Sequence, residues 1–289
     1  MPQRITGYTE LIGLVAKPIR HSKSPMMHNT AFEALGLDYA YLVFEVDAPQ
    51  LGSAVEGLRA LGARGFNVSM PYKRAMLEYM DELMPAGALC GAVNTVINDN
   101  GHLIGTNTDG EGFTTACKNA GITLPGQKVT LLGAGGAGTA LAMQAGLEGV
   151  AELSIFNRDD EFRPQAERNA RTLNEQTACR AAAYPLEDRE LLRAKIQESS
   201  VLINATSVGF GKQEGMCPIP DASYLRADLA VADVIYMPDQ TPLLALAEQA
   251  GCRWINGIGM MLYQGAAAFK LGTGRDMPIE EVKAALGVV

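Results

Sequence analysis

The chain has 289 residues, which suits one large domain or two domains of ordinary size. Hydrophobic residues make up 47% of it and charged residues 19%, a balance typical of a globular protein with a substantial core and without long disorder. The net charge of −8 offers no basic face to nucleic acid, so an anionic ligand would need a locally positive pocket.

Three further features of the sequence bear on the protein's cellular location and on metal binding. The N-terminal stretch lacks the charged-then-apolar pattern of a signal peptide, and no apolar run approaches the roughly 20 residues of a membrane span. The five cysteines are scattered without a CxxC pair, which favours buried, reduced thiols in the cytoplasm. The three histidines show no metal-ligand spacing. We therefore expect a cytoplasmic protein that binds no membrane, no nucleic acid and no metal.

In the first part of the chain, apolar runs alternate with helical sequence. The expected elements are a strand over 11–16, a helix over 24–35, a strand over 39–46, a helix over 49–61, a strand over 64–69, a short helix from Pro71, and strands over 93–97 and 102–105. Ser24 is the expected N-cap of its helix, with Pro25 at the first helical position. Asn100-Gly101 predicts a hairpin, because this dipeptide supplies positive φ. One hairpin among alternating strands and helices predicts an α/β fold with a mixed sheet.

A second alternation of strands and helices follows a helix near 111–120 and a turn at 124–128. Its expected elements are strands over 129–132, 153–156, 201–203 and 230–235, a helix over 139–147, and a last apolar helix over 260–271. This order is typical of a Rossmann-type, doubly wound parallel sheet. We expect two domains: a substrate-binding domain over 1–112, on which the C-terminal helix 260–289 packs back, and a dinucleotide-binding domain over 113–259.

A glycine-rich turn follows the strand at 129–132. It reads Gly133-Ala134-Gly135-Gly136-Ala137-Gly138 and has the GxGxxG spacing of a dinucleotide site. The first glycine permits the tight turn, the second lets the backbone approach a pyrophosphate, and the third lets the helix pack against the strand. A purely structural turn is the alternative, but the flanking strand and helix favour a cofactor. A P-loop is disfavoured, because Thr139 stands where lysine would be needed.

The cofactor type depends on the end of the next strand, Asn157-Arg158-Asp159-Asp160. An acid at this place hydrogen-bonds the ribose of NAD, whereas arginine accommodates the extra phosphate of NADP. Arg158 could stack on adenine or meet a phosphate, but Asp159 and Asp160 would repel a 2′-phosphate. The sequence therefore predicts NAD as the preferred cofactor and NADP as the second option. A solvated charge cluster is the alternative.

Four short segments in the first half of the chain are rich in small polar residues. They are Ser22-Lys23-Ser24-Pro25, Asn67-Val68-Ser69-Met70-Pro71-Tyr72-Lys73, Gly91-Ala92-Val93-Asn94-Thr95 and Asn107-Thr108-Asp109-Gly110. Together with the glycine-rich turn, Asn157-Arg158, Asn204-Ala205-Thr206-Ser207 and Met260-Met261-Leu262-Tyr263-Gln264, they occur in the order found in the shikimate dehydrogenase family. The chain resembles that family, including its quinate/shikimate dehydrogenase branch, over nearly its whole length.

The resemblance implies a role for each matching residue. Ser22 and Ser24 would hold the substrate carboxylate, at a helix N-terminus that favours an anion. Ser69, Asn94 and Gln264 would hydrogen-bond the ring hydroxyls, with Ser69 in place of the more usual threonine. Tyr236 would face substrate or cofactor, although Met237 stands where asparagine is common. The implied cofactor contacts are the turn from Gly133 to Gly138, Asn157, Arg158, Asp160, Thr206 and Gly257.

Lys73 and Asp109 are the catalytic pair that the resemblance implies. Oxidising a secondary alcohol needs a base that takes the hydroxyl proton, and an amine can do so only when it is neutral. We expect Lys73 in the first turn of the helix that begins at Pro71, where the helix dipole would favour the neutral amine. Asp109 would fix the amine's position. A surface salt bridge is the alternative for any lysine and aspartate chosen at random.

The expected reaction is the interconversion of shikimate and 3-dehydroshikimate, a step of aromatic amino acid biosynthesis by the chorismate pathway. Quinate and 3-dehydroquinate are the second substrate pair, because the two acids share the carboxylate and ring hydroxyls. Two alternatives remain at this point, a folate-type methylene dehydrogenase and a non-enzymatic NAD-sensing module. The expected partner is a small cyclic acid, and a homodimer is left open.

Overall fold

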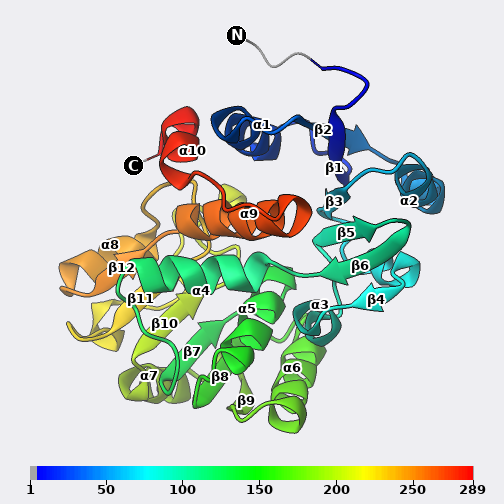
Figure 1. The fold of residues 1–289 in the computed structure, drawn as a ribbon. Helices are drawn as coiled ribbons and strands as arrows, with labels where there is room; N and C mark the ends of the chain where they lie inside the picture. Colours follow the sequence, from blue (N-terminus) through cyan, green and yellow to red (C-terminus); the bar gives the residue numbers. More distant parts are fainter. Residues whose placement is uncertain (1–4, 289) are drawn as a thin grey trace. The chain divides into compact units, whose positions relative to one another are not determined.

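The computed structural model describes residues 5–288. The chain divides into two compact units. The first unit comprises the chain up to Thr108 and the chain from Gln264 onward, and the second unit runs from Asp109 to Tyr263. The second unit thus begins four residues before the expected boundary at 113. Each unit contains one six-stranded sheet (Figure 1).

The first unit contains a mixed sheet. Its elements are β1 (Glu10–Ala16), α1 (Ser24–Leu35), β2 (Tyr39–Glu45), α2 (Leu51–Ala60), β3 (Gly65–Val68), a 3-10 helix (Ala75–Tyr79), β4 (Glu82–Leu83), α3 (Pro85–Cys90), β5 (Thr95–Asp99), β6 (His102–Thr106), the second part of α9 (Ile258–Thr273) and α10 (Ile279–Leu286). The strand order is β2-β1-β3-β5-β6-β4. Strands β1, β2 and β3 run parallel, and β5 is antiparallel to β3 and β6. This confirms the α/β fold with a mixed sheet.

The predicted hairpin is present between β5 and β6. Asp99 pairs with His102, and the two residues between them, Asn100 and Gly101, have φ of 53° and 95°. The predicted helix at Pro71 is wrong, because residues 70–74 form turns and the helical stretch is a 3-10 helix that begins only at Ala75. The buried side chains of Tyr72 and Met76 anchor this segment in the core of the first unit.

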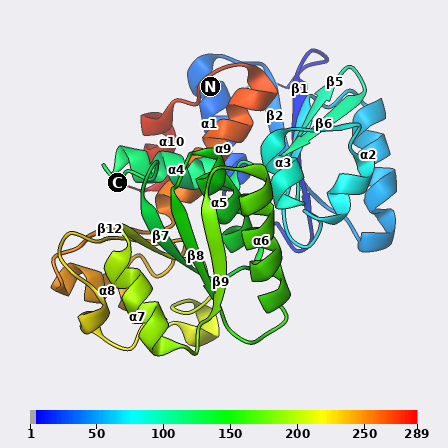
Figure 2. The ribbon, with the colours of Figure 1, turned by 90° about the horizontal axis from the view of Figure 1, so that it is seen from below.

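The second unit contains a wholly parallel sheet. Its elements are α4 (Asp109–Asn119), β7 (Lys128–Leu132), α5 (Gly136–Leu147), β8 (Glu152–Asn157), α6 (Arg163–Gln176), β9 (Arg180–Pro185), α7 (Arg189–Glu198), β10 (Val201–Asn204), β11 (Ala230–Asp233), α8 (Pro242–Gln249), β12 (Arg253–Ile255) and the start of α9. Figure 2 shows β7, β8 and β9 side by side, with α6 next to β9. The order β12-β11-β10-β7-β8-β9 is that of a Rossmann-type sheet, with its switch point between β7 and β10.

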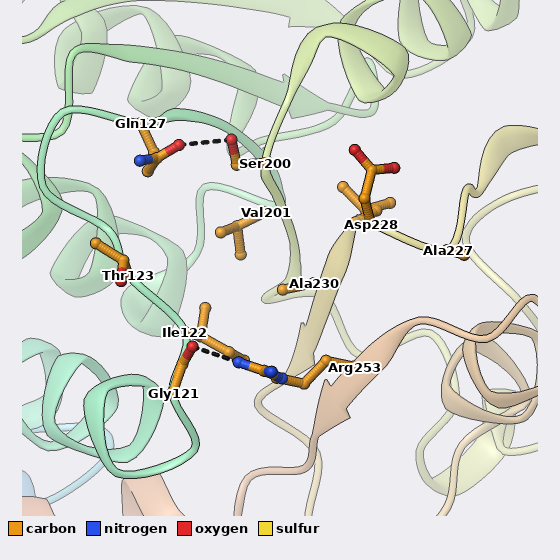
Figure 3. Close-up of a pocket in the computed structure, with 11 residues that line it drawn as sticks. Gly121, Ile122, Thr123, Gln127, Ser200, Val201, Ala227, Asp228, Ala230 and Arg253 are labelled. Atoms are coloured by element: carbon orange, nitrogen blue, oxygen red, sulfur yellow. Dashed lines mark hydrogen bonds between the residues drawn. The ribbon is translucent and has the colours of Figure 1, made fainter.

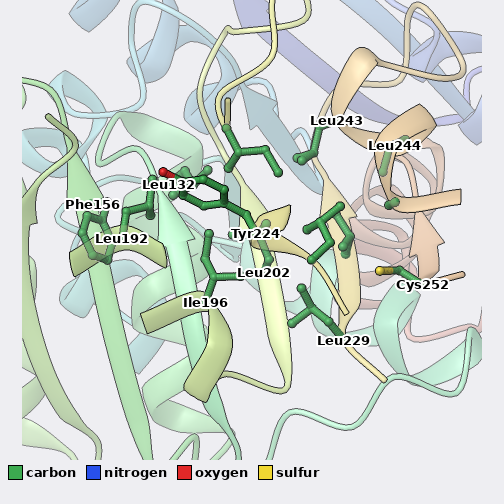
Figure 4. Close-up of a cluster of buried hydrophobic side chains, with 14 of the residues drawn as sticks. Leu132, Phe156, Leu192, Ile196, Leu202, Tyr224, Leu229, Leu243, Leu244 and Cys252 are labelled. Atoms are coloured by element: carbon green, nitrogen blue, oxygen red, sulfur yellow. The ribbon is translucent and has the colours of Figure 1, made fainter. Parts of the chain in front are cut away.

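The core of the second unit supports this switch point. Leu132 of β7 and Leu202 of β10 are fully buried, and Ile196 of α7 and Leu244 of α8 pack into the same cluster (Figure 4). Parallel strands covered on both faces require such continuous apolar sequence. The loops that leave β7 and β10 at their carboxyl ends therefore start from a rigid base, where ligands bind in open α/β sheets.

Candidate active site

The glycine-rich turn has the geometry that a dinucleotide phosphate requires. Gly133 has a φ of 97°, which favours glycine, and a Cβ on Gly138 would lie 2.1 Å from the carbonyl oxygen of Gly133. A Cβ on Gly135 or Gly136 would instead meet no atom within 4 Å, so open space adjoins the start of α5. The cap residue Gly135 offers no side chain to the first backbone N–H groups of α5. These groups and the helix dipole suit a phosphate, so the residues fit a dinucleotide.

The end of β8 fixes both the turn and the adjacent charges. The Asn157 Oδ1 accepts a hydrogen bond of 2.9 Å from the backbone N of Ala134, and its Nδ2 donates to Asp160 Oδ1 at 2.8 Å. Arg158 lies 3.4 Å from Asp160 in an ion pair, with its side chain about half exposed. The arginine that would accommodate a 2′-phosphate therefore has a carboxylate beside it.

A buried carboxylate connects the loops that follow β10 and β11. The Asp233 side chain, 1% exposed, accepts hydrogen bonds from Asn204 Nδ2 at 3.1 Å, the backbone N of Ile235 at 3.0 Å and the Thr241 hydroxyl at 2.8 Å. Asn204 in turn accepts from the hydroxyl of Thr206 at 2.7 Å. We call Asn204, Asp233 and Thr241 the Asp233 network. Asp233 and Thr241 belong to no local sequence motif, because they come together only in the folded unit.

Ala205 and Thr206, which follow Asn204 of this network, pack against the glycine-rich turn. A Cβ on Gly133 would lie 2.9 Å from the carbonyl oxygen of Ala205 and from the methyl group of Thr206. A Cβ on Gly257 would lie 2.0 Å from the carbonyl oxygen of Val234, so both predicted glycines permit close backbone approach. Tyr236 follows in the same loop, with its side chain 42% exposed. The second unit therefore gathers Thr206, Gly257 and the glycine-rich turn at one edge of its sheet.

The two serines of the first unit stand at the start of α1. The N-cap of α1 is Lys23 and makes no side-chain cap bond, so the predicted capping role of Ser24 is wrong. Ser24 is already helical, and its backbone N donates instead to the Ser22 hydroxyl at 3.1 Å. The two hydroxyls are also 3.1 Å apart. The Ser24 side chain is thus not used as a cap, and two hydroxyls meet at a helix N-terminus.

The carboxyl end of β3 and the start of β5 lie side by side and bring together three of the predicted positions, Ser69, Lys73 and Asn94. Ser69 follows β3, and its backbone N donates to Val15 at 3.1 Å. The backbone carbonyl of Lys73 accepts from Val93 at 2.7 Å, so Lys73 is anchored beside Asn94. The Asn94 Oδ1 accepts from the backbone N of Thr108 at 2.8 Å, immediately before Asp109 in the chain. No helix begins at Pro71, so the argument from a helix dipole does not apply to Lys73.

The two remaining predicted residues, Asp109 and Gln264, lie on helices. Asp109 is the first residue of α4. Gln264 lies on α9 and is half-buried. The next residue, Gly265, packs against α1, since a Cβ there would lie 2.6 Å from the Met27 Cε.

A pocket of the second unit lies away from the glycine-rich turn. It has a volume of about 360 Å³ and is lined by Gln127, Ser200, Asp228 and Arg253, among others (Figure 3). These residues stand at the amino ends of the strands, whereas the dinucleotide turn follows the carboxyl end of β7. Arg253 already donates to the carbonyl of Gly121, and Gln127 accepts from Ser200. We therefore do not assign the dinucleotide to this pocket.

Other site types receive no support from the described residues. Within residues 5–288, no helix is long and apolar enough to cross a membrane. No group of three or more histidine, cysteine, aspartate or glutamate side chains in that range could hold a metal ion. All five cysteines are free; Cys117, Cys179 and Cys252 are buried, and Cys90 and Cys217 are half-buried.

Comparisons with known proteins agree with the residue patterns. Residues 14–96 match the model of the shikimate dehydrogenase substrate binding domain, and residues 257–286 match that of the shikimate 5'-dehydrogenase C-terminal domain. A shikimate dehydrogenase (NADP(+)) of Listeria monocytogenes is 52% identical over 281 residues, 97% of each chain.

Two solved structures are also similar. Shikimate 5-dehydrogenase from Listeria monocytogenes, in complex with shikimate and NAD, has a TM-score of 0.97 and 52% identity, covering 99% of both chains. Quinate dehydrogenase from Corynebacterium glutamicum, in complex with NAD, has a TM-score of 0.86 and 28% identity, covering 96% of this chain and 98% of that one. These matches favour neither a folate-type enzyme nor a sensing module, and the chain belongs to the shikimate dehydrogenase family.

Proposed function

We propose that this protein interconverts shikimate and 3-dehydroshikimate with a nicotinamide cofactor. The observation that carries the proposal is the 52% identity, over 97% of both chains, to a shikimate dehydrogenase. The geometry supports it from both units. The second unit has a glycine-rich turn with open space at Gly135 and Gly136, and the first unit has paired hydroxyls at Ser22 and Ser24.

In this proposal Lys73 and Asp109 carry the proton chemistry. The nicotinamide ring, when bound, exchanges a hydride with the carbon that bears the reacting hydroxyl. During oxidation that carbon loses the hydride, its hydroxyl loses a proton to the Lys73 Nζ, and a ketone forms. During reduction Lys73 returns the proton to the forming alkoxide. Asp109 orients the amine, while Ser22 and Ser24 hold the carboxylate and Ser69, Asn94 and Gln264 hold the ring hydroxyls.

The proposal is tested by initial rates with two acids and two cofactors. Shikimate and quinate are each offered with NAD and with NADP, and reduction of the nicotinamide is followed by its absorbance. We expect shikimate to be oxidised, and quinate to be oxidised as well, because it shares the carboxylate and ring hydroxyls. Absence of nicotinamide reduction with both acids, in both directions of the reaction, would contradict the proposal.

We further propose that NAD is preferred over NADP, although the Listeria monocytogenes relative is named for NADP(+). The support is the ion pair between Arg158 and Asp160, together with the exposed carboxylate of Asp159, whose side chain is 81% exposed. A 2′-phosphate at this place would meet two carboxylates and an arginine that is already paired. Electrostatic complementarity of this kind decides specificity more than overall affinity.

Replacing Asp160 by serine tests this cofactor preference. Asp160→Ser keeps an oxygen for the backbone N of Phe162, which now donates to Asp160 at 2.9 Å, but it removes the charge that pairs with Arg158. We expect the ratio of kcat/KM for NADP to that for NAD to rise about tenfold, because the Asp160 carboxylate no longer repels the 2′-phosphate and no longer pairs with Arg158. Glu161→Gln is the matched control, because it removes the neighbouring charge without touching Arg158. An equal rise in the control would assign the preference to net charge alone.

A further inference from the structure

Ala134 in the glycine-rich turn is held by side chains at both of its backbone polar groups. The residue is fully buried. Its backbone N donates to the Asn157 Oδ1 at 2.9 Å, and its carbonyl oxygen accepts from the Thr139 hydroxyl at 3.3 Å. Two side chains from different elements, β8 and α5, therefore set the orientation of this part of the turn.

The bond from Thr139 also sets the direction of the N–H group that follows. Ala134 and Gly135 are joined by a trans peptide bond, in which the C=O of the first residue and the N–H of the second point in opposite directions. The carbonyl points towards Thr139, so the Gly135 N–H points away from it. Open space adjoins Gly135, where a Cβ would meet no atom of the described residues within 4 Å. This N–H therefore suits a phosphate oxygen at the start of α5.

The Thr139 hydroxyl is itself held by the neighbouring helix α6. The Asn169 Nδ2 donates to the Thr139 oxygen at 3.0 Å. Both residues are buried, Thr139 with 7% and Asn169 with 1% of its surface exposed. A hydroxyl has one hydrogen, and Asn169 supplies the hydrogen of its own bond, so the hydroxyl hydrogen remains for the Ala134 carbonyl. Asn169 thus fixes the direction in which Thr139 donates.

Two further residues of α6 fix the Asn169 amide. The Gln165 Nε2 donates to the Asn169 Oδ1 at 2.7 Å, and the Gln165 Oε1 accepts from the Arg168 Nη2 at 2.7 Å. From Arg168 to the turn, every side chain donates to the next one, and linked hydrogen bonds in a low-dielectric interior polarise and strengthen one another. Burying an amide costs free energy unless it is hydrogen-bonded, and Asn169 uses both its oxygen and its nitrogen. We call Arg168, Gln165, Asn169 and Thr139 the α6 hydrogen-bond chain.

We propose that Asn169 is a positioning residue for the nicotinamide cofactor, which acts through Thr139 to keep the Gly135 N–H directed at the pyrophosphate. The inference rests on the proposed function, because it assumes that the glycine-rich turn binds a nicotinamide dinucleotide. Asn169 lies outside the GxGxxG motif and is too deeply buried to touch the cofactor itself. A turn that is held in its binding geometry in advance loses less conformational freedom when the cofactor binds, and this raises the affinity.

The first test removes the hydroxyl of Thr139. In Thr139→Val a methyl group takes its place, so Asn169 and the Ala134 carbonyl both lose their partner. We expect the KM for NAD to rise about tenfold, the KM for shikimate to stay unchanged, and Thr139→Ser to restore the wild-type value. Thr130→Val is the matched control, since it removes a buried threonine hydroxyl that bonds with Ser199 instead. Equal KM values for NAD in Thr139→Val and Thr139→Ser would overturn the inference.

The second test reverses one bond of the α6 hydrogen-bond chain. In Asn169→Asp a carboxylate oxygen replaces the donor, so the Thr139 hydroxyl donates to it and leaves the Ala134 carbonyl. We expect the KM for NAD to rise about as much as in Thr139→Val. Asn174→Asp is the control, because it places the same charge on α6 at a residue that bonds away from the turn. Thermal unfolding of all variants reports whether they fold, and equal rises in the two aspartate variants would overturn the inference.

A double-mutant cycle shows whether Asn169 acts through Thr139. Asn169→Leu and Thr139→Val are made singly and together, and calorimetry with NAD alone gives the Kd of each variant. We expect the double variant to lose at least about threefold less affinity than the product of the two single losses, since both changes break the same chain. Simple multiplication of the losses overturns the inference alone. Wild-type protein that binds no nicotinamide cofactor overturns the proposed function and the inference together.

Discussion

Lys73→Ala is expected to lower kcat for shikimate oxidation about a thousandfold, within the range of 100- to 10,000-fold that positioned proton transfer contributes. The hydroxyl proton then has no amine to receive it, so water, a much weaker base, must accept the proton. The KM for the nicotinamide cofactor should stay the same, because Lys73 belongs to the first unit and the glycine-rich turn to the second. Steady-state kinetics with each substrate varied in turn separates the two effects.

A second lysine, on α4, provides the control for this variant. Lys118→Ala removes an exposed lysine from the last turn of α4 and should leave kcat near the wild-type value. Small external amines should partly restore the Lys73→Ala variant, since they can occupy the space of the missing side chain and accept the proton. A kcat near wild type in Lys73→Ala would remove Lys73 from the proposed mechanism.

The second unit was the part most open to prediction from sequence. Its strands are short apolar runs, and the spacing from Gly133 to Gly138 follows one of them, so period and motif agree. The Ala-rich strand β9 was missed, because its residues are mostly half-buried and show no alternation. The two-residue strand β4 was missed as well, since only its pairing with β6 defines it.

The first unit shows where local rules fail. Pro71 satisfies the rule for a helix start, yet the chain turns there because Tyr72 is buried and its hydroxyl donates to the Val46 carbonyl at 2.6 Å. Ser24 satisfies the rule for an N-cap, yet Ser22 takes the backbone N–H instead. The Tyr41 hydroxyl donates to Asn67, which lies 26 residues away in the chain, so no local pattern links them. For Pro71 and Tyr41 a tertiary contact decided the outcome, whereas for Ser24 a competing bond from two residues earlier did.

Asp233→Ala is expected to lower the free energy of unfolding by about 3 kcal/mol, because three buried donors lose their acceptor at once. The loops after β10 and β11 lose their common anchor, so the KM for the nicotinamide cofactor should rise with the loss of stability. Denaturant unfolding and kinetics measure the two effects. Asp228→Ala, whose side chain is 76% exposed, should stay within about 0.5 kcal/mol of wild type.

Asp233→Asn separates the hydrogen bonds from the charge. An amide oxygen can accept from Asn204 and Ile235, and the amide nitrogen can donate to the Thr241 oxygen, so the network can persist. Burial raises the pKa of Asp233 above its ordinary value in the folded protein. The folded state therefore holds this proton more tightly than the unfolded state, and ionisation opposes folding.

The sign of the pH dependence follows from that raised pKa. As the pH rises from about 4, the ordinary pKa of an aspartate, through the higher folded value, the wild type loses stability at this position and the asparagine variant does not. Asp233→Asn should thus gain stability relative to wild type between pH 4 and pH 7, in urea unfolding at each pH. A difference that is constant over this range would mean that Asp233 keeps the same proton affinity when the chain unfolds. A difference that grows towards low pH would mean that its three donors outweigh burial.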